Sequence, residues 1–171
     1  MSVEEHKQGA PQSVACMVLT VSDTRTEATD KSGQLIQALL EEEGHNVILY
    51  QIVTDDPERI KGAIYQGLTH ADVQAILING GTGIAQRDVT YETVASLLEK
   101  EMPGFGEIFR YLSYTEDIGS AAMLSRAIAG TVQGKVIFAM PGSSKAVRLA
   151  MTKLVLPELG HIVKELHKDR R

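Results

Sequence analysis

A glycine-rich segment in the middle of the chain has the clearest pattern for chemistry. It follows an apolar run, Val73 to Ile78, and precedes apolar residues at helical spacing. Glycine lets backbone N–H groups turn toward a ligand, and a following helix offers its positive end to an anion. The segment therefore predicts a phosphate-binding loop, with a simple tight turn as the alternative. The loop residues are Gly80, Gly81, Thr82 and Gly83.

A second segment of the same kind follows the apolar run Val136–Met140. It reads Pro141, Gly142, Ser143 and Ser144, with Lys145 opening a helical pattern. Two anion-binding turns on one sheet edge suit a ligand with two phosphate-bearing parts. The alternative is that Ser143 or Ser144 only caps the helix.

Two aspartates near these segments are candidate metal ligands. Asp88 follows Arg87 and the glycine loop, and Asp55 follows the apolar run Val47–Val53. A carboxylate beside bound phosphates repels them unless it holds a cation. Mg²⁺ binds one or two carboxylates together with substrate phosphates. We therefore predict Mg²⁺ at Asp88 and Asp55, although either aspartate could instead cap a helix.

Four nearly continuous apolar runs are expected to position these residues. Such runs are typical of strands buried on both faces of a parallel sheet. Helical patterns in the connections favour an α/β fold with an open, mostly parallel, doubly wound sheet. Ligands bind to such sheets beyond the carboxyl ends of the strands, where the polar segments occur. The predicted strands are Val14–Val21, Val47–Val53, Val73–Ile78 and Val136–Met140.

The helical patterns have recognisable start and stop signals. One helix is expected from a cap at Asp30 to Gly44, and another from Asp56, a cap followed by proline. Helical patterns fill residues 90–126 with a break at 102–104, and residues 131–135 predict a hairpin turn into the last strand. Two more helices are expected, one over residues 147–154 and one after residue 157.

Length and composition favour one domain. The chain has 171 residues, 43% of them hydrophobic, and we place the domain at residues 13–167 with flexible tails at 1–12 and 168–171. A formal net charge of −5 provides no overall basic field for nucleic acid or a membrane surface. No signal peptide or membrane-spanning run is present in the sequence. The one cysteine, Cys16, is expected to be buried, and a reducing cytoplasmic location is expected.

Several motifs in fixed order resemble the MoaB/MogA family of molybdenum-cofactor biosynthesis proteins. NGGTGIAQRDVTYE begins at residue 79, MPGFGEIFR at 102, LSRAIAG at 124 and MPGSSKA at 140. TVSDTR at residue 20 and DKSG at residue 30 are similar to the family's opening segment. The resemblance therefore extends over nearly the whole chain, which makes it more specific than a single glycine loop.

The resemblance implies a molybdopterin-binding α/β fold and a reaction in which ATP adenylylates molybdopterin and releases pyrophosphate, with Mg²⁺ present. By position, Asp55 and Asp88 resemble the family's two functional aspartates, as catalytic residues and metal ligands. The terminal phosphate of molybdopterin would attack the α-phosphorus of ATP, so no side-chain nucleophile is needed. The matching binding positions are Ser22, Asp30, Gly80, Gly81, Thr82, Gly83, Thr90, Gly142, Ser143 and Ser144.

Three departures place the chain nearer the MoaB branch. Gln86 and Tyr91 stand where MogA-like members carry a basic residue and a proline, and the Pro-Gly-Ser-Ser segment replaces their Pro-Gly-x-Pro loop. The alternative function is a non-catalytic protein that holds molybdopterin or a precursor for handover. A nucleotide-binding oxidoreductase is disfavoured because the G-x-G-x-x-G pattern is missing. The resemblance also implies a homo-oligomer, either a hexamer or a trimer.

Overall fold

The computed structural model describes residues 2–170; Met1 and Arg171, the outer ends of the two predicted tails, lie outside the described residues. Its six strands are β1 Ala15–Val21, β2 Asn46–Val53, β3 Ala75–Asn79, β4 Lys100–Glu101, β5 Ile128–Val132 and β6 Lys135–Met140. They form one sheet in the order β2-β1-β3-β6-β5-β4, in which β2, β1, β3 and β6 are parallel. The predicted open, mostly parallel, doubly wound sheet is confirmed.

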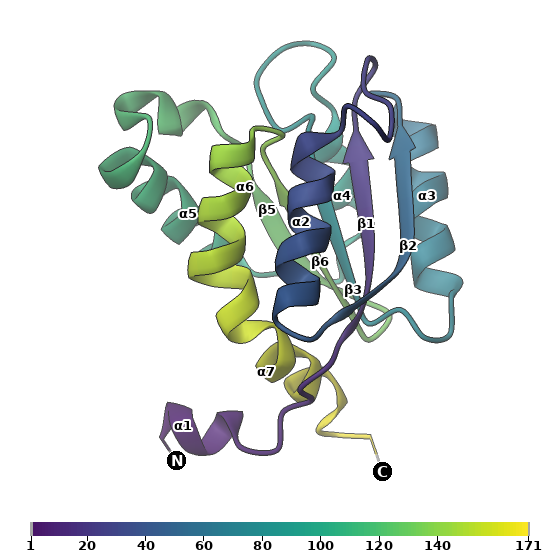
Figure 1. The fold of residues 1–171 in the computed structure, drawn as a ribbon, viewed down its shortest axis with the longest axis vertical. Helices are drawn as coiled ribbons and strands as arrows, with labels where there is room; N and C mark the ends of the chain where they lie inside the picture. Colours follow the sequence, from purple (N-terminus) through teal and green to yellow (C-terminus); the bar gives the residue numbers. More distant parts are fainter. Residues whose placement is uncertain (1, 171) are drawn as a thin grey trace.

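Helices cover both faces of the sheet (Figure 1). They are α1 Val3–Lys7, α2 Lys31–Glu42, α3 Pro57–Thr69, α4 Thr90–Leu97, α5 Pro103–Glu116, α6 Ser144–Ala150 and α7 Leu156–His167, with a 3₁₀ helix η1 at Gly119–Leu124. The helices α2, α5, α6 and α7 pack on one face, and α3 and α4 pack on the other. The two layers of helices leave the carboxyl edge of the parallel strands accessible to a ligand.

Each face of the sheet has its own hydrophobic core. Within β1, Val18 belongs to the core under α2 and α6, and Leu19 belongs to the core under α3. Both side chains are fully buried. Alternate residues of one strand thus pack against opposite helix layers, which explains why the strand sequences are nearly continuous apolar runs.

The sequence predicts the hairpin turn into β6 but neither of the strands β4 and β5 at the antiparallel edge of the sheet. Strand β5 reaches β6 through Gln133 and Gly134, whose φ angles are 52° and 74°, as a tight hairpin requires. The predicted hairpin is therefore present, but β5 is rich in alanine and glycine, which have weak strand preference. Strand β4 has two residues and interrupts the segment 90–126 that was predicted to be helical. That prediction is wrong at β4, whereas the expected break near residue 103 is confirmed as the start of α5.

The two predicted C-terminal helices form one continuous rod. Between α6 and α7 the chain makes a π-helical turn, Met151–Val155. Pro157 lies in the first turn of α7 and has no N–H to donate, and the wider turn before it accommodates this missing hydrogen bond.

The amino-terminal segment packs beside α7. Helix α1 lies inside the predicted tail, and Lys7 Nζ is 2.6 Å from Glu158 Oε1. The domain limits 13–167 and the flexibility of the tails stay predictions.

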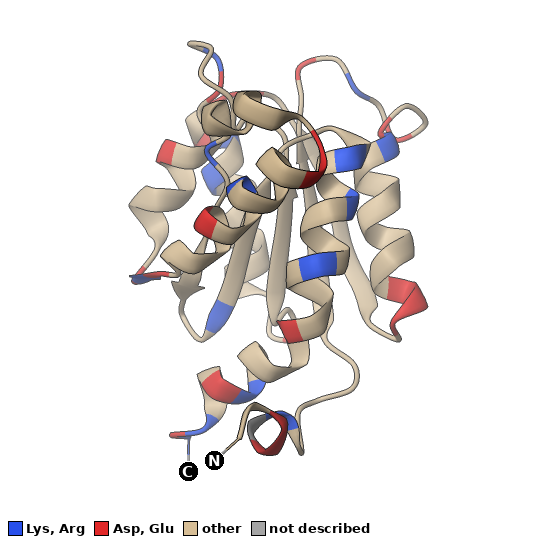
Figure 2. Ribbon diagram, turned by 90° about the vertical axis from the view of Figure 1, so that its left-hand side faces the viewer, with Lys and Arg blue, Asp and Glu red and all other residues tan. Residues whose placement is uncertain are grey.

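No helix among the described residues is long and apolar enough to cross a membrane. In Figure 2, both acidic and basic positions occur in the loops above the sheet.

Candidate functional site

A cavity of about 620 Å³ lies at the carboxyl ends of the parallel strands. The chain passes from β1 to β2 on one side and then returns to β3 on the other side of β1. Ligands of doubly wound sheets bind at such a reversal of strand order. The loops after β1, β2, β3 and β6 line the cavity together with α5 and η1. Its volume is in the usual range for small-molecule sites, about 300–1,000 Å³.

The structure brings most of the predicted site residues together at this cavity. Nine of them line it: Ser22, Asp55, Gly80, Gly81, Thr82, Gly83, Asp88, Gly142 and Ser143. Asp30, Thr90 and Ser144 do not line it. The binding and catalytic roles of all twelve residues stay predictions, but their convergence from four loops gives the cavity a defined chemistry.

The glycine loop after β3 has a conformation that requires glycine. Gly80 and Gly81 have φ angles of 97° and 70°, a region that other residues rarely adopt. A Cβ at Gly80 would lie 2.2 Å from the Val21 carbonyl oxygen, and one at Gly81 would lie 2.2 Å from Thr90 Oγ1. Within the described residues, the N–H groups of residues 81–84 have no hydrogen-bond acceptor. These free donors suit an anionic ligand.

Arg126 holds the glycine loop from outside the cavity. Its backbone N–H donates to Thr82 O at 2.9 Å, its Nε to Gly83 O at 2.8 Å, and one terminal nitrogen to Asp88 O at 2.9 Å. The guanidinium carbon also lies 5.4 Å from the centre of the Tyr91 ring. Since C=O and N–H point in opposite directions across a trans peptide, these contacts turn the following N–H groups away from Arg126. Sequence reasoning did not identify Arg126.

The turn after β6 is built differently. The Ser143 hydroxyl accepts a hydrogen bond from Ala146 N at 3.2 Å, so Ser143 caps α6, as the alternative interpretation expected. Ser144 is the first residue of that helix. A Cβ at Gly142 would lie 3.3 Å from Gly80 Cα, which shows that the two turns pack directly against each other.

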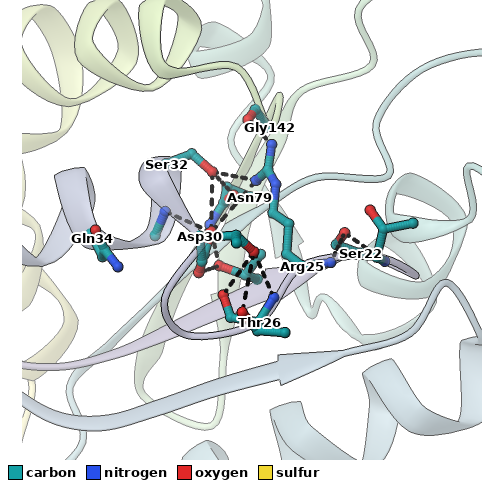
Figure 3. A network of polar contacts seen from close by, with 12 residues as sticks. Ser22, Arg25, Thr26, Asp30, Ser32, Gln34, Asn79 and Gly142 are labelled. Atoms are coloured by element: carbon teal, nitrogen blue, oxygen red, sulfur yellow. Dashed lines mark hydrogen bonds and ion pairs between the residues drawn. The ribbon is translucent and has the colours of Figure 1, made fainter.

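Asp30 organises a polar network next to the cavity (Figure 3). Its buried carboxylate caps α2 by accepting a hydrogen bond from Gly33 N, and it also accepts from Thr20 Oγ1 at 2.6 Å and Tyr50 Oη at 2.5 Å. Burial, followed by the hydrogen bond to Asp30, raises the pKa of Tyr50, which keeps the phenol protonated. The predicted helix cap at Asp30 is confirmed.

Four aspartates line the cavity, and two of them have basic partners. Asp23 Oδ2 lies 2.5 Å from a terminal nitrogen of Arg87, and Asp117 Oδ1 lies 3.6 Å from Lys145 Nζ. The other two are Asp55 and Asp88, which form no ion pair with any described residue. The unpaired carboxylates are therefore the two that the sequence singled out.

Neither of these aspartates caps a helix, so that alternative is wrong for both. Asp56 caps α3, and the amino-terminal residue of α4, Val89, has no side-chain cap. Asp88 Oδ2 instead accepts a hydrogen bond from Ala85 N at 2.9 Å within the loop. Burial, then the negative charges of Asp23 and Asp88, raise the pKa of Asp55.

The residues present fit Mg²⁺ only in the company of a ligand. No group of three or more histidine, cysteine or acidic side chains in the described chain could hold a metal ion. After burial and the charge of Asp23, the charge of Asp88 also contributes to the raised pKa of Asp55, and a cation relieves such repulsion. Two carboxylates plus phosphate oxygens form a usual Mg²⁺ site.

Two buried hydroxyl groups lack partners in the described structure. They belong to Thr90, which is fully buried beside Gly81, and to Ser125, which lines the cavity. Ser125 was missed by the sequence analysis, as were Asp23 and Arg25 on the β1 side of the cavity. The motifs TVSDTR and LSRAIAG contain all three residues, but a motif does not show which side chains face a ligand.

Comparison with known proteins identifies the family. Residues 17–161 match the family model described as a probable molybdopterin binding domain. A Bacillus cereus protein named molybdenum cofactor biosynthesis protein B is 63% identical over 169 residues, which cover 99% of this chain and 100% of the relative.

Solved structures agree with this assignment. A crystal structure of molybdenum cofactor biosynthesis protein B has 62% identity and a TM-score of 0.91, covering 94% of this chain and 99% of the other. A MogA structure has 27% identity and a TM-score of 0.79, covering 89% and 99%. The chain therefore belongs to the MoaB/MogA family, nearer its MoaB branch, and has a role in molybdenum cofactor biosynthesis.

Proposed function

We propose that this protein binds molybdopterin and adenylylates its terminal phosphate with ATP and Mg²⁺, releasing pyrophosphate. The observation that supports this reaction best is the packing of the glycine loop against the Pro141–Ser144 turn, beside two unpaired aspartates. Adenylyl transfer joins two anionic molecules, so its site must hold two phosphate groups close together. The adjacent turns provide places for both.

In this proposal the glycine loop binds the molybdopterin phosphate. The free N–H groups of residues 81–84 would donate to its oxygens, while Arg126 holds the loop carbonyls on the other side. Phe109, Ile118 and Leu124 line the cavity from α5 and η1 and would provide apolar contacts for the flat pterin. The nucleotide would then occupy the side formed by Ser22 and the turn at Gly142.

Asp55 and Asp88 would hold Mg²⁺ through their carboxylates. The bound ion would supply electrostatic stabilisation of the charge that collects on the departing pyrophosphate. The chain itself orients the two phosphate groups, so that an oxygen of molybdopterin faces the α-phosphorus of ATP as the bond to pyrophosphate breaks. The attacking group is already an anion, and no side chain of the cavity needs to remove a proton from it.

A carrier of molybdopterin is the second candidate, and two observations favour it. The described cavity lining contains four aspartates but a single basic residue, which gives few cationic contacts for a triphosphate. The Ser143 hydroxyl, moreover, already caps α6. A protein with only the glycine loop as an anion site would bind molybdopterin and no nucleotide.

Thermal unfolding with each ligand separates the two candidates. An adenylyltransferase must bind ATP with Mg²⁺, and a ligand that prefers the native state raises the melting temperature. We expect a rise with ATP and Mg²⁺ alone, which shrinks on chelation and in Asp88→Asn. The control is Asp72→Asn, an exposed aspartate outside this cavity.

The carrier proposal predicts a different pattern. Molybdopterin would raise the melting temperature, while ATP with Mg²⁺ would leave it unchanged. A cytoplasmic location and a trimeric or hexameric assembly stay predictions, which cell fractionation and light scattering test.

A further inference from the structure

Arg25 differs in charge from every other described residue of the cavity lining. It is the one basic residue of that lining, and it follows β1 on the side of the Gly142 turn. Its side chain is 31% exposed, whereas the Asp30 side chain beside it is fully buried. The Arg25 side chain therefore reaches the cavity, whereas the carboxylate of Asp30 does not.

Buried and backbone groups fix the position of this guanidinium (Figure 3). One terminal nitrogen donates to Ser32 Oγ at 2.5 Å and lies 3.5 Å from Asp30 Oδ1. The other donates to the carbonyl oxygen of Gly142 at 2.8 Å. Ser32 in turn donates to Asn79 Oδ1 at 2.7 Å, which ties the group to the end of β3. Arg25 is thus oriented before any ligand arrives, which lowers the entropic cost of binding.

The contacts of Arg25 leave part of its hydrogen-bonding capacity unused. An arginine side chain has five N–H donors. The contacts to Ser32, Asp30 and Gly142 occupy one donor each, so the Nε–H group and one terminal N–H have no acceptor among the described residues. N–H donors of a guanidinium group form strong, charge-assisted hydrogen bonds with phosphate oxygens.

We propose that Arg25 binds a phosphate group of the ligand in this cavity, at the side of the Gly142 turn. The proposal rests on the proposed function in one respect, namely that the ligand bears phosphate. Two sources have this chemistry: the triphosphate of ATP and the terminal phosphate of molybdopterin. Arg25 lies against the turn assigned above to the nucleotide, so we expect ATP to be the source.

Separate calorimetric titrations with ATP plus Mg²⁺ and with molybdopterin test this proposal. Arg25→Gln removes the charge and should weaken binding of ATP about tenfold or more, the usual effect of losing a charged hydrogen bond. Arg25→Lys keeps a charge without the guanidinium group and should give an intermediate affinity. Arg148→Gln, an exposed arginine of α6 outside the cavity, should bind like the wild type.

Salt dependence distinguishes a contact with the ligand from mere support of the turn. Loss of a direct charge contact makes the affinity less sensitive to ionic strength, and loss of structural support does not. Weaker binding with a shallower salt dependence supports the proposal, and the ligand that loses affinity identifies the phosphate. Affinities within twofold of wild type for both ligands, or weaker binding with an unchanged salt dependence, overturn it.

The result also separates this proposal from the proposed function. Wild-type protein that binds molybdopterin but no ATP contradicts adenylyl transfer, and the molybdopterin titration alone then decides whether Arg25 is a ligand contact. Wild-type protein that binds neither ligand overturns both proposals.

Discussion

The two turns that meet at the cavity are held by arginines with opposite tasks. Arg126 lies outside the cavity lining and gives its donors to carbonyls of the glycine loop and to Glu92. Arg25 lies in the lining and keeps two donors free beside the Gly142 turn. An arginine side chain thus supports one of the proposed anion sites and completes the other. The two arginines differ because backbone N–H groups are the free donors at the glycine loop, whereas the side chain of Arg25 supplies the free donors at the Gly142 turn.

This contrast predicts different sensitivities of the two turns. In the proposed function the glycine loop binds through its backbone, so changes in its shape should impair folding and binding together. The Gly142 turn begins an ordinary capped helix, so binding there can be lost without loss of the fold. The following substitutions test this difference, beginning with the largest expected effect.

Gly80→Ala should disrupt the glycine loop most. The added Cβ would collide with the Val21 carbonyl oxygen. Alanine would also have to adopt a φ angle of 97°, which residues with a side chain rarely do. We expect the free energy of unfolding to fall by about 3 kcal/mol, the upper range for backbone strain, together with loss of molybdopterin binding. Chemical denaturation and calorimetry measure both effects. Gly104→Ala, where a Cβ meets no atom within 4 Å, is the control. Wild-type stability of Gly80→Ala would show that the loop tolerates a side chain.

Arg126→Gln should destabilise the glycine loop by removing the contacts that its carbonyl groups make outside the cavity. The change removes the side-chain hydrogen bonds to Gly83 O and Asp88 O, and we expect a loss of about 2 kcal/mol in unfolding free energy. Molybdopterin binding should weaken with no change in its salt dependence, because Arg126 lies outside the cavity lining. A shallower salt dependence, like that expected for Arg25→Gln, would erase the contrast between the two arginines.

Asp55→Asn should stabilise the fold while abolishing turnover. The raised pKa means that folded protein binds the Asp55 proton more tightly than unfolded protein, so stability falls as pH rises through this pKa. The ionised Asp55 carboxylate therefore destabilises the folded protein at neutral pH, and the uncharged asparagine removes this destabilisation. Asp23→Asn should do the opposite, because hydrogen bonds from Asp55 N and Arg87 lower the pKa of Asp23. Melting temperatures at pH 7 that move in the same direction for both variants would contradict this account.

His45 should show the smallest effect, because it lies outside the cavity lining. Its buried Nδ1 accepts a hydrogen bond from Val14 N at 3.0 Å, and burial lowers its pKa below 6.5. The unfolded state therefore gains the proton first, and stability declines as pH falls below about 6.5. Unfolding curves between pH 7.5 and 5 should be flatter for His45→Gln. An unchanged slope would mean that His45 is not the titrating group.

The parallel part of the sheet could be predicted because strands that are buried on both faces have nearly continuous apolar sequences. Every residue of β3 is buried, and its sequence is apolar except for Asn79, where the strand reaches the site. Strand β5 has the backbone pairing of a strand but side chains such as Ala129 and Gly130, whose preference for strands is weak. The strand conformation of β5 depends on its pairing with β6, which the turn at residues 133–134 indicates but the composition of β5 does not.

In the candidate site, too, only residues with a local sequence signal could be predicted. Gly80, Gly81 and Asp88 were predictable, since turn glycines and a nearby acid have a local meaning. Arg25 and Arg126 were not, because their partners are distant in sequence: Arg25 bonds Gly142, 117 residues away, and Arg126 bonds Gly83, 43 residues away. Only the folded chain shows that the two arginines hold different sides of one cavity.

Direct detection of the product tests the central claim. Purified protein is incubated with molybdopterin, ATP and Mg²⁺, and the pterins are separated and identified by mass. We predict adenylylated molybdopterin and an equal amount of pyrophosphate, both absent when Mg²⁺ is chelated and in Asp88→Asn. Recovery of unmodified molybdopterin from wild-type protein that demonstrably binds it would contradict adenylyl transfer and leave the carrier function.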